Sequence, residues 1–128
     1  MPKILVKQLG ISAGSNISIS SDGVISSTAT GGGRPTVNSI SSNTVISNPA
    51  SSDSWIIYNS TSATAISVTL PTAVGIAGMR YDIKRSGLGT VTVNTTSSQT
   101  IDSLSSIVMT SQYSNLTVVS DNSNWIIV

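Results

Sequence analysis

The sequence predicts an all-β protein: an antiparallel β-sandwich or barrel-like domain with an extended N-terminal arm. Charged residues form 9% of the 128-residue chain, against roughly 25% in ordinary globular domains. Ser and Thr supply about one residue in three, and Val and Ile recur in short blocks. Turn-forming residues separate these blocks about every ten residues, which is the spacing of strands in sandwiches and barrels.

Residues 1–33 are expected to form the arm and a glycine hinge. The stretch "KILVKQL" resembles a short strand with apolar residues on both sides, which could add to the edge of a partner's sheet. Its candidate anchoring residues are Ile4, Leu5, Val6 and Leu9. Further along, Asp22-Gly23 in "NISISSDGVISS" predicts a hairpin turn.

A boundary is expected after Gly33. Three glycines followed by Arg34-Pro35 cannot extend a helix or a central strand, so this stretch is a linker. Residues 34–128 are then the β-domain. Its expected strands lie at 37–40, 44–46, 53–59, 65–71, 79–85, 90–95, 99–102, 106–110 and 115–120, with a last strand at the C-terminus.

The tripeptide Trp-Ile-Ile occurs twice, at 55–57 and at 125–127, each time after Ser-Asp and a short polar step. Burial of such side chains stabilises a fold by ~2–3 kcal/mol each, so both indoles are expected in the core. The repeated tripeptide would be explained by two similar strands, or by two strands that pair with each other or lie in equivalent sheets. The residues assigned to a core or oligomer strand are Trp55, Trp125, Ile126 and Ile127.

The composition argues against catalysis. The chain has no His, Cys, Glu or Phe, so the common general base, the thiol nucleophile and the usual zinc ligands are absent. We therefore expect no enzyme, and we assign no catalytic, cofactor-binding or metal-binding residue. The net charge of +1 provides no basic field for nucleic acid or an anionic membrane, so neither is expected as a partner.

The five carboxylates are all Asp, and a glycosidase would need two of them facing each other across the substrate. Four lie next to Ser, Asn or Gly, which indicates turns, and "DNSN" (121–124) indicates a hairpin turn rather than a calcium loop. Asp82 lies between Arg80 and Lys84 and is expected to form a surface ion pair. Arg80, Lys84 and Arg85 would form a solvated strand face or, alternatively, contact an acidic partner.

Three stretches resemble, in their order, a module of bacteriophage virion-surface proteins. They are "VTLPTAVGIAGMRYDIKRSG", "TVTVNTTSSQTID" and "YSNLTVVSDNSNWIIV". In capsid decoration, head-fibre and tail-fibre proteins a similar order occurs: Thr-Leu-Pro, a glycine turn, an aromatic-x-Ile-Lys strand, Gln-Thr-Ile-Asp and a final Asn-Trp. The resemblance lies between positions 55 and 128, more than half of the chain. It implies a small β-domain that trimerises on a virion surface, capsid or tail.

Three functions are compatible with these features. The first is a homotrimeric capsid decoration (cement) or head-fibre protein, anchored by its arm to the major capsid protein or another virion protein. The second is a tail-fibre or receptor-binding tip, and the third is a carbohydrate-binding β-module. The first is preferred because the chain contains no long shaft and because aromatic residues, which glycan binding favours, form only 4% of it.

Overall fold

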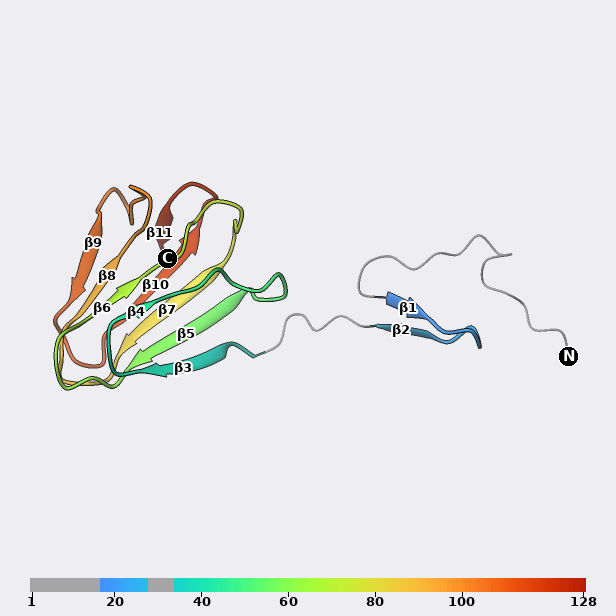
Figure 1. The fold of residues 1–128 in the computed structure, drawn as a ribbon, viewed down its shortest axis with the longest axis horizontal. Coiled ribbons are helices and arrows are strands. Elements are labelled where there is room, and N and C mark those ends of the chain that lie inside the picture. Colours follow the sequence, from blue (N-terminus) through green and yellow to red (C-terminus); the bar gives the residue numbers. More distant parts are fainter. Residues whose placement is uncertain (1–16, 28–33) are drawn as a thin grey trace, which may run out of the picture. The chain divides into compact units, whose positions relative to one another are not determined.

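A computed structural model describes residues 17–27 and 34–128 (Figure 1). The chain forms two compact units, 1–33 and 34–128. In the first unit, β1 (Ile17–Ile19) pairs antiparallel with β2 (Ile25–Ser27). Gly23 has a φ of 79° in the connecting turn, which confirms the predicted hairpin. The anchoring stretch at residues 4–9 lies outside the described residues.

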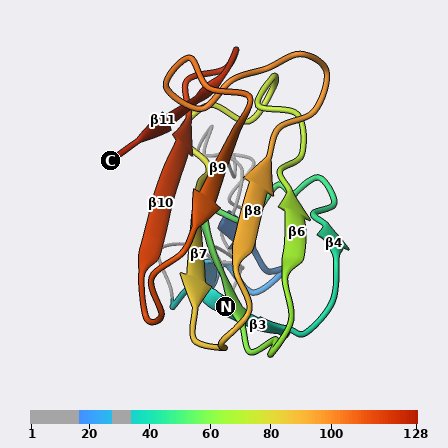
Figure 2. The ribbon, with the colours of Figure 1, turned by 90° about the vertical axis from the view of Figure 1, so that its left-hand side faces the viewer.

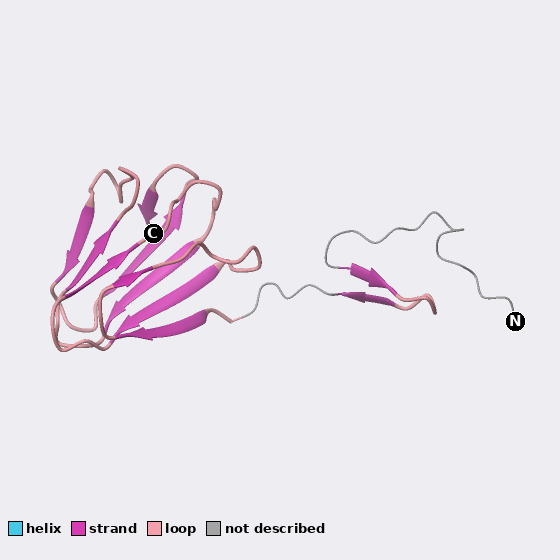
Figure 3. Ribbon diagram, viewed as in Figure 1, coloured by secondary structure: helices cyan, strands magenta, loops and turns pink. Residues whose placement is uncertain are grey.

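The second unit is all-β, and its described residues contain no helix (Figure 3). Its strands are β3 (Thr36–Ile40), β4 (Thr44–Val45), β5 (Trp55–Ser60), β6 (Ile66–Thr69), β7 (Arg80–Arg85), β8 (Val91–Asn94), β9 (Ser106–Met109), β10 (Asn115–Ser120) and β11 (Trp125–Ile127). A five-stranded sheet has the order β11-β10-β7-β5-β3, and a four-stranded sheet has the order β4-β6-β8-β9. Figure 2 shows the four-stranded sheet side by side in this order.

The chain winds between the two sheets as a coil. It passes from β3 to β4, from β5 to β6 and from β7 to β8, and each turn adds one strand to each sheet. The pairs β3–β5, β5–β7, β4–β6 and β6–β8 are therefore parallel. The expected antiparallel sandwich is wrong in this respect, because within residues 34–128 only the pairs formed by β9, β10 and β11 are antiparallel.

The second turn of the coil (β5 and β6) pairs with the third turn (β7 and β8) at one constant separation along the sequence. Trp55 pairs with Arg80 in one sheet and Ile66 pairs with Val91 in the other, so the same separation along the sequence relates the paired strands of both sheets. The connecting loops stack closely as well. A Cβ on Gly89 would lie 1.8 Å from the Thr64 carbonyl oxygen, which explains why glycine is needed in "SGLG".

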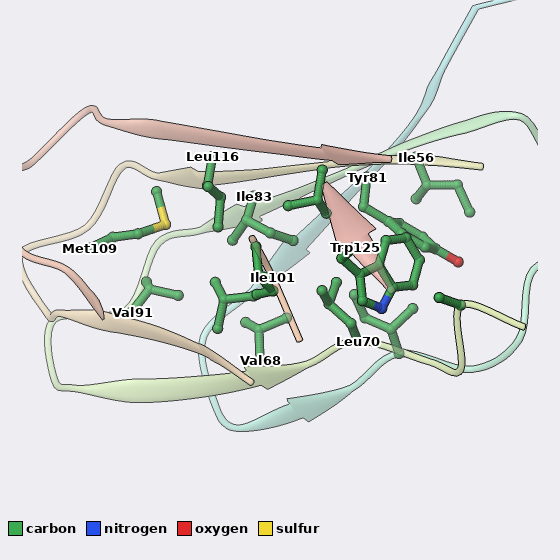
Figure 4. Packing of buried hydrophobic residues seen from close by; sticks show 14 of the residues in the cluster. Ile56, Val68, Leu70, Tyr81, Ile83, Val91, Ile101, Met109, Leu116 and Trp125 are labelled. Atoms are coloured by element: carbon green, nitrogen blue, oxygen red, sulfur yellow. The ribbon is translucent and has the colours of Figure 1, made fainter. Parts of the chain in front are cut away.

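The core lies between the sheets and follows the strand alternation predicted from sequence. Val68 and Leu70 point inward, and Tyr81 and Ile83 approach from the opposite sheet (Figure 4). Ile66 is buried in the same core. Trp125 is fully buried among them. Its ring centroid lies 5.5 Å from that of Tyr81. The last strand thus completes the core.

The outer edge of β11 is covered by the segment before β9. The Trp125 amide donates to the Thr100 carbonyl, the Asp102 amide donates to the Trp125 carbonyl, and Asp102 Oδ1 accepts from the Ile127 amide. The strand expected at 99–102 is reduced to isolated bridges of Ile101. This segment and Asp102 occupy main-chain groups that would otherwise form an open sheet edge.

Candidate functional site

The outer face of the five-stranded sheet carries the site. The strand register places Trp55, Arg80, Val119 and Ile126 in one row across the sheet. A second row contains Val37, Ile57, Asp82 and Thr117. Residues two apart on a strand share one face of the sheet, so both rows point away from the core. We call these eight side chains the Trp55 face.

Asp82 is the centre of a hydrogen-bonded cluster on this face. Trp55 Nε1 donates to Asp82 Oδ2 at 2.7 Å. Arg80 Nε donates to Oδ1 at 3.2 Å, and Arg80 Nη2 donates to Oδ2 at 3.1 Å. The guanidinium carbon of Arg80 also lies 4.6 Å from the Trp55 ring centroid, within the range of a cation–π contact. Three side chains thus hold one another in fixed positions.

The cluster keeps the Asp82 carboxylate ionised. Burial by itself would raise the pKa of Asp82, but hydrogen bonds from Arg80, Thr117 and Trp55, together with the Arg80 charge, outweigh it and lower the pKa below the ordinary value. The Asp82 side chain is only 8% exposed, whereas that of Arg80 is 41% exposed. The carboxylate is therefore largely removed from solvent by its own partners, even though it lies on the outer face of the sheet.

The outer face of the four-stranded sheet differs in chemistry. Its interior positions are Ser67, Thr69, Thr92 and Asn94, all of them uncharged and polar. Among the strand residues of this sheet, exposed apolar side chains occur only on the two edge strands, at Val45 and Val108. One outer face thus has the composition of a solvated surface, and the other carries an indole, branched aliphatic side chains and an ion pair.

The three basic residues singled out in the sequence do not share one face. Arg80 and Lys84 both lie on the outer face of β7, on either side of Asp82, and Lys84 donates to the Tyr113 carbonyl. Arg85 points inward and is buried, and its guanidinium donates to the carbonyls of Gly89, Leu88 and Thr110. Arg85 is therefore not available to a surface partner, and it braces the loop after β7 instead.

The two tryptophans lie on opposite faces of the five-stranded sheet. Trp125 lies in the core, but Trp55 is 36% exposed on the outer face, which corrects the expectation that both indoles are buried. Ile126 and Ile127 are exposed by 39% and 42%. The alternation of apolar and polar residues could not show which face Trp55 occupies, because "WIIYN" places apolar residues on both faces of its strand.

Asp53 and Asp121 have local structural roles. Asp53 Oδ2 accepts from the Ala50 amide, and Asp121 Oδ1 accepts from the amides of Ser123 and Asn124. The second arrangement confirms the predicted turn at 121–124, and the same hydrogen bonds lower the pKa of Asp121. The ion pair expected for Asp82 is also present, with Arg80 as its partner, although the carboxylate is largely buried.

A shallow cleft of about 540 Å³ lies between the loops around residues 49–54 and 75–79. Asp53 is the ionisable residue in its lining. Burial, followed by the nearby negative charge of Asp53, raises the pKa of Tyr58, and burial raises the pKa of Tyr81.

Within residues 17–27 and 34–128, no three metal-ligating side chains come together. No helix in these residues reaches the length and hydrophobicity of a membrane span.

Comparisons with known proteins do not identify a relative: no family model, no curated protein and no solved structure matches the chain.

Proposed function

We propose that this chain is a non-enzymatic structural protein of a bacteriophage virion, a homotrimeric capsid decoration or head-fibre protein located on the virion surface. Residues 1–33 anchor it to the major capsid protein or another virion protein, and the β-domain faces outward. Nucleic acid, membrane and cofactors have no part in this function.

The observation that carries the proposal is the division of the chain after Gly33. The β-domain contains its own core, drawn from both sheets. The segment before it leads directly into β3, an edge strand of the five-stranded sheet. An anchor connected by glycines to a self-contained domain suits a protein that is fixed to a shell, and the similarity of positions 55–128 to virion-surface modules supports the same function.

The arm can be tested on phage heads that lack decoration. Deletion of residues 2–30 should abolish binding to such heads while the β-domain keeps its circular dichroism spectrum and oligomeric state. Leu5→Asp should weaken binding strongly, because a charge in an added strand must be desolvated. Gln8→Asp, a matched change at a polar position of the same stretch, should have little effect. A deletion variant that binds as tightly as the full chain would show that the arm is not the anchor.

The exposed Trp55 supports a second candidate, a tail-fibre tip or carbohydrate-binding module. Its indole is partly exposed beside two charged side chains, and exposed aromatic rings offer a flat apolar surface with polar groups at the edge. Full-length protein that ignores heads and instead coats host cells would favour this candidate over decoration.

A further inference from the structure

The two sheets of the β-domain contain unequal numbers of strands. The four-stranded sheet ends at β9, which shares a groove with β10, whereas the five-stranded sheet continues past β10 to β11. Ile127 lies two residues after the buried Trp125 and therefore on the core side of β11. Its register partner Val118 is fully buried, but Ile127 itself is 42% exposed. The core side of the longer sheet is thus left uncovered beyond the edge of β9.

The edge of β9 presents open main-chain groups. The hydrogen bond from the Thr95 amide to the Ser105 carbonyl fixes the alternation of the β8–β9 ladder. By this alternation the main-chain groups of Ile107 face β8, and those of Ser106 and Val108 point away from it. In the described part of the chain β9 pairs with no other strand. These groups are therefore available to an added strand.

A groove of about 260 Å³ follows this edge, between β9 and β10. Residues 107–111 and 114–116 line it, and none of them is charged. Met109 and Leu116 belong to the buried core cluster, so the groove borders the core. Figure 2 shows β9 at the edge of its sheet with β10 of the other sheet beside it. A strand paired with β9 would direct every second side chain toward this groove.

The groove fits a free extended segment rather than a second β-domain. Strands β3 and β9 of another copy already belong to packed sheets, and a strand inside a packed sheet cannot enter a groove between two layers. The arm of this chain carries Lys3 and Lys7 around its apolar stretch. The groove lining offers no carboxylate to these ammonium groups, and the Arg85 guanidinium contacts the Thr110 carbonyl at one end. An uncharged strand is therefore the better electrostatic match.

We propose that the β9 edge is a strand-acceptor site. A free extended segment of another protein, uncharged and with apolar residues at alternate positions, adds a fifth strand to the four-stranded sheet there. Main-chain hydrogen bonds to β9 supply affinity, and the side chains that face the groove supply selectivity. This site is separate from the arm, to which the proposed function assigns the anchor, and from the Trp55 face on the other sheet.

Two matched variants of the full chain test the site. Val108→Pro removes an outward amide donor and places a ring on the β9 edge. Val37→Pro makes the same change on β3, where the Ile40 carbonyl accepts from the Thr61 amide, so the Val37 amide points away from β5. The two valines are 54% and 61% exposed. Edge strands tolerate proline where the N–H faces solvent, so both variants should keep the circular dichroism spectrum of the parent.

The probe is a blocked seven-residue peptide in which Thr and Val alternate, titrated into isotope-labelled full-length protein and followed by NMR. Binding should slow hydrogen exchange of the Ser106 and Val108 amides. Val108→Pro should raise the dissociation constant at least about tenfold, because a hydrogen bond is lost and the ring blocks the edge. Val37→Pro should leave it unchanged. A peptide with Asp in place of its central Val should bind at least about tenfold more weakly, because the groove desolvates the charge.

The proposal is overturned if the peptide leaves both exchange rates unchanged, or if Val37→Pro weakens binding as much as Val108→Pro. Other occupants give distinct results in the protein without peptide. Slow exchange of the Val108 amide that becomes fast after deletion of residues 2–30 would assign the edge to the arm. Slow exchange that is lost on dilution would assign it to a second copy. Either result would contradict a separate protein as the occupant.

Discussion

The two Trp-Ile-Ile segments belong to the same five-stranded sheet and have opposite roles. In β11 the tryptophan points inward and closes the core against Tyr81, while the following isoleucines are partly exposed. In β5 the tryptophan points outward and the following isoleucine is buried. The two strands are not neighbours, because β10 and β7 lie between them. The same tripeptide thus supports the core in one strand and the candidate site in the other.

This difference follows from the phase of each strand rather than from its composition. A shift by one residue exchanges the two faces of a strand, and neighbouring strands decide which phase is realised. Ser120 is the register partner of Trp125 and leaves room for an indole on the core side. Arg80 is the register partner of Trp55 and supplies a cation on the outer side. The partner strand therefore determines whether the tryptophan stabilises the fold or forms a surface.

The largest expected effect is the difference in unfolding free energy lost when each tryptophan is replaced by alanine. Trp125→Ala should lower the free energy of unfolding by about 3–5 kcal/mol, because it opens a large cavity in the core. Trp55→Ala should cost about 1–2 kcal/mol, mainly through the lost hydrogen bond to Asp82. Chemical denaturation of the two variants beside the parent measures the difference. Equal losses would contradict the distinction between a core indole and a surface indole.

Much of the fold was predictable from local pattern. The strands around residues 66–70 and 79–85 alternate clearly, and the structure confirms their inward residues. The coil was not predictable in this way. Short, regular spacings suit hairpins, but here the short connections join strands of different sheets. The constant offset between turns leaves little trace in the sequence, because only the inward positions of the two turns share a requirement for apolar residues.

The candidate site was predictable only in part. The i, i+2 positions of Arg80, Asp82 and Lys84 on one face of a strand predicted an ion pair for Asp82, and the structure forms it with Arg80. The contribution of Trp55 did not, because it comes from β5, which the coil brings beside β7. Arg85 illustrates the opposite error. Its neighbours suggested a basic surface, but the inward phase of position 85 and the carbonyls of a stacked loop bring its guanidinium into the interior.

A smaller effect is expected from the centre of the Trp55 face. Asp82→Asn keeps the size of the side chain but removes the charge that Arg80 and Trp55 contact. An amide NH₂ group would also face donors of the guanidinium. The free energy of unfolding should fall by about 1–2 kcal/mol, less than for a buried ion pair because Arg80 is partly solvated. Equilibrium unfolding at neutral pH measures this, and an unchanged stability would show that the cluster has no energetic role.

The smallest expected effect is the pH dependence of the stability difference between the parent and Asp82→Asn. The pKa of Asp82 is lower in the folded protein than its ordinary value of 3.8. Between these two values the unfolded chain binds more protons than the folded one, so stability rises with pH. The contribution of Asp82 is therefore complete above the ordinary value, and it decreases as the pH falls below 3.8 toward the folded pKa.

The stability difference between the parent and Asp82→Asn should thus be constant near neutral pH and should shrink in acid. Denaturant unfolding of both proteins across this range measures it. Asp121 also has a lowered pKa, caused by the amides of Asn124 and Ser123, so Asp82 is not the only source of acid sensitivity in the parent. Subtracting the unfolding free energy of Asp82→Asn from that of the parent at each pH removes the Asp121 contribution, which both proteins share.

Asp121→Asn serves as the control. This variant should lose the pH dependence that comes from the turn and keep the pH dependence that comes from Asp82 on the Trp55 face. If the difference between the parent and Asp82→Asn does not change with pH, the cluster does not lower the pKa of Asp82, and the Trp55 face is held together by packing alone.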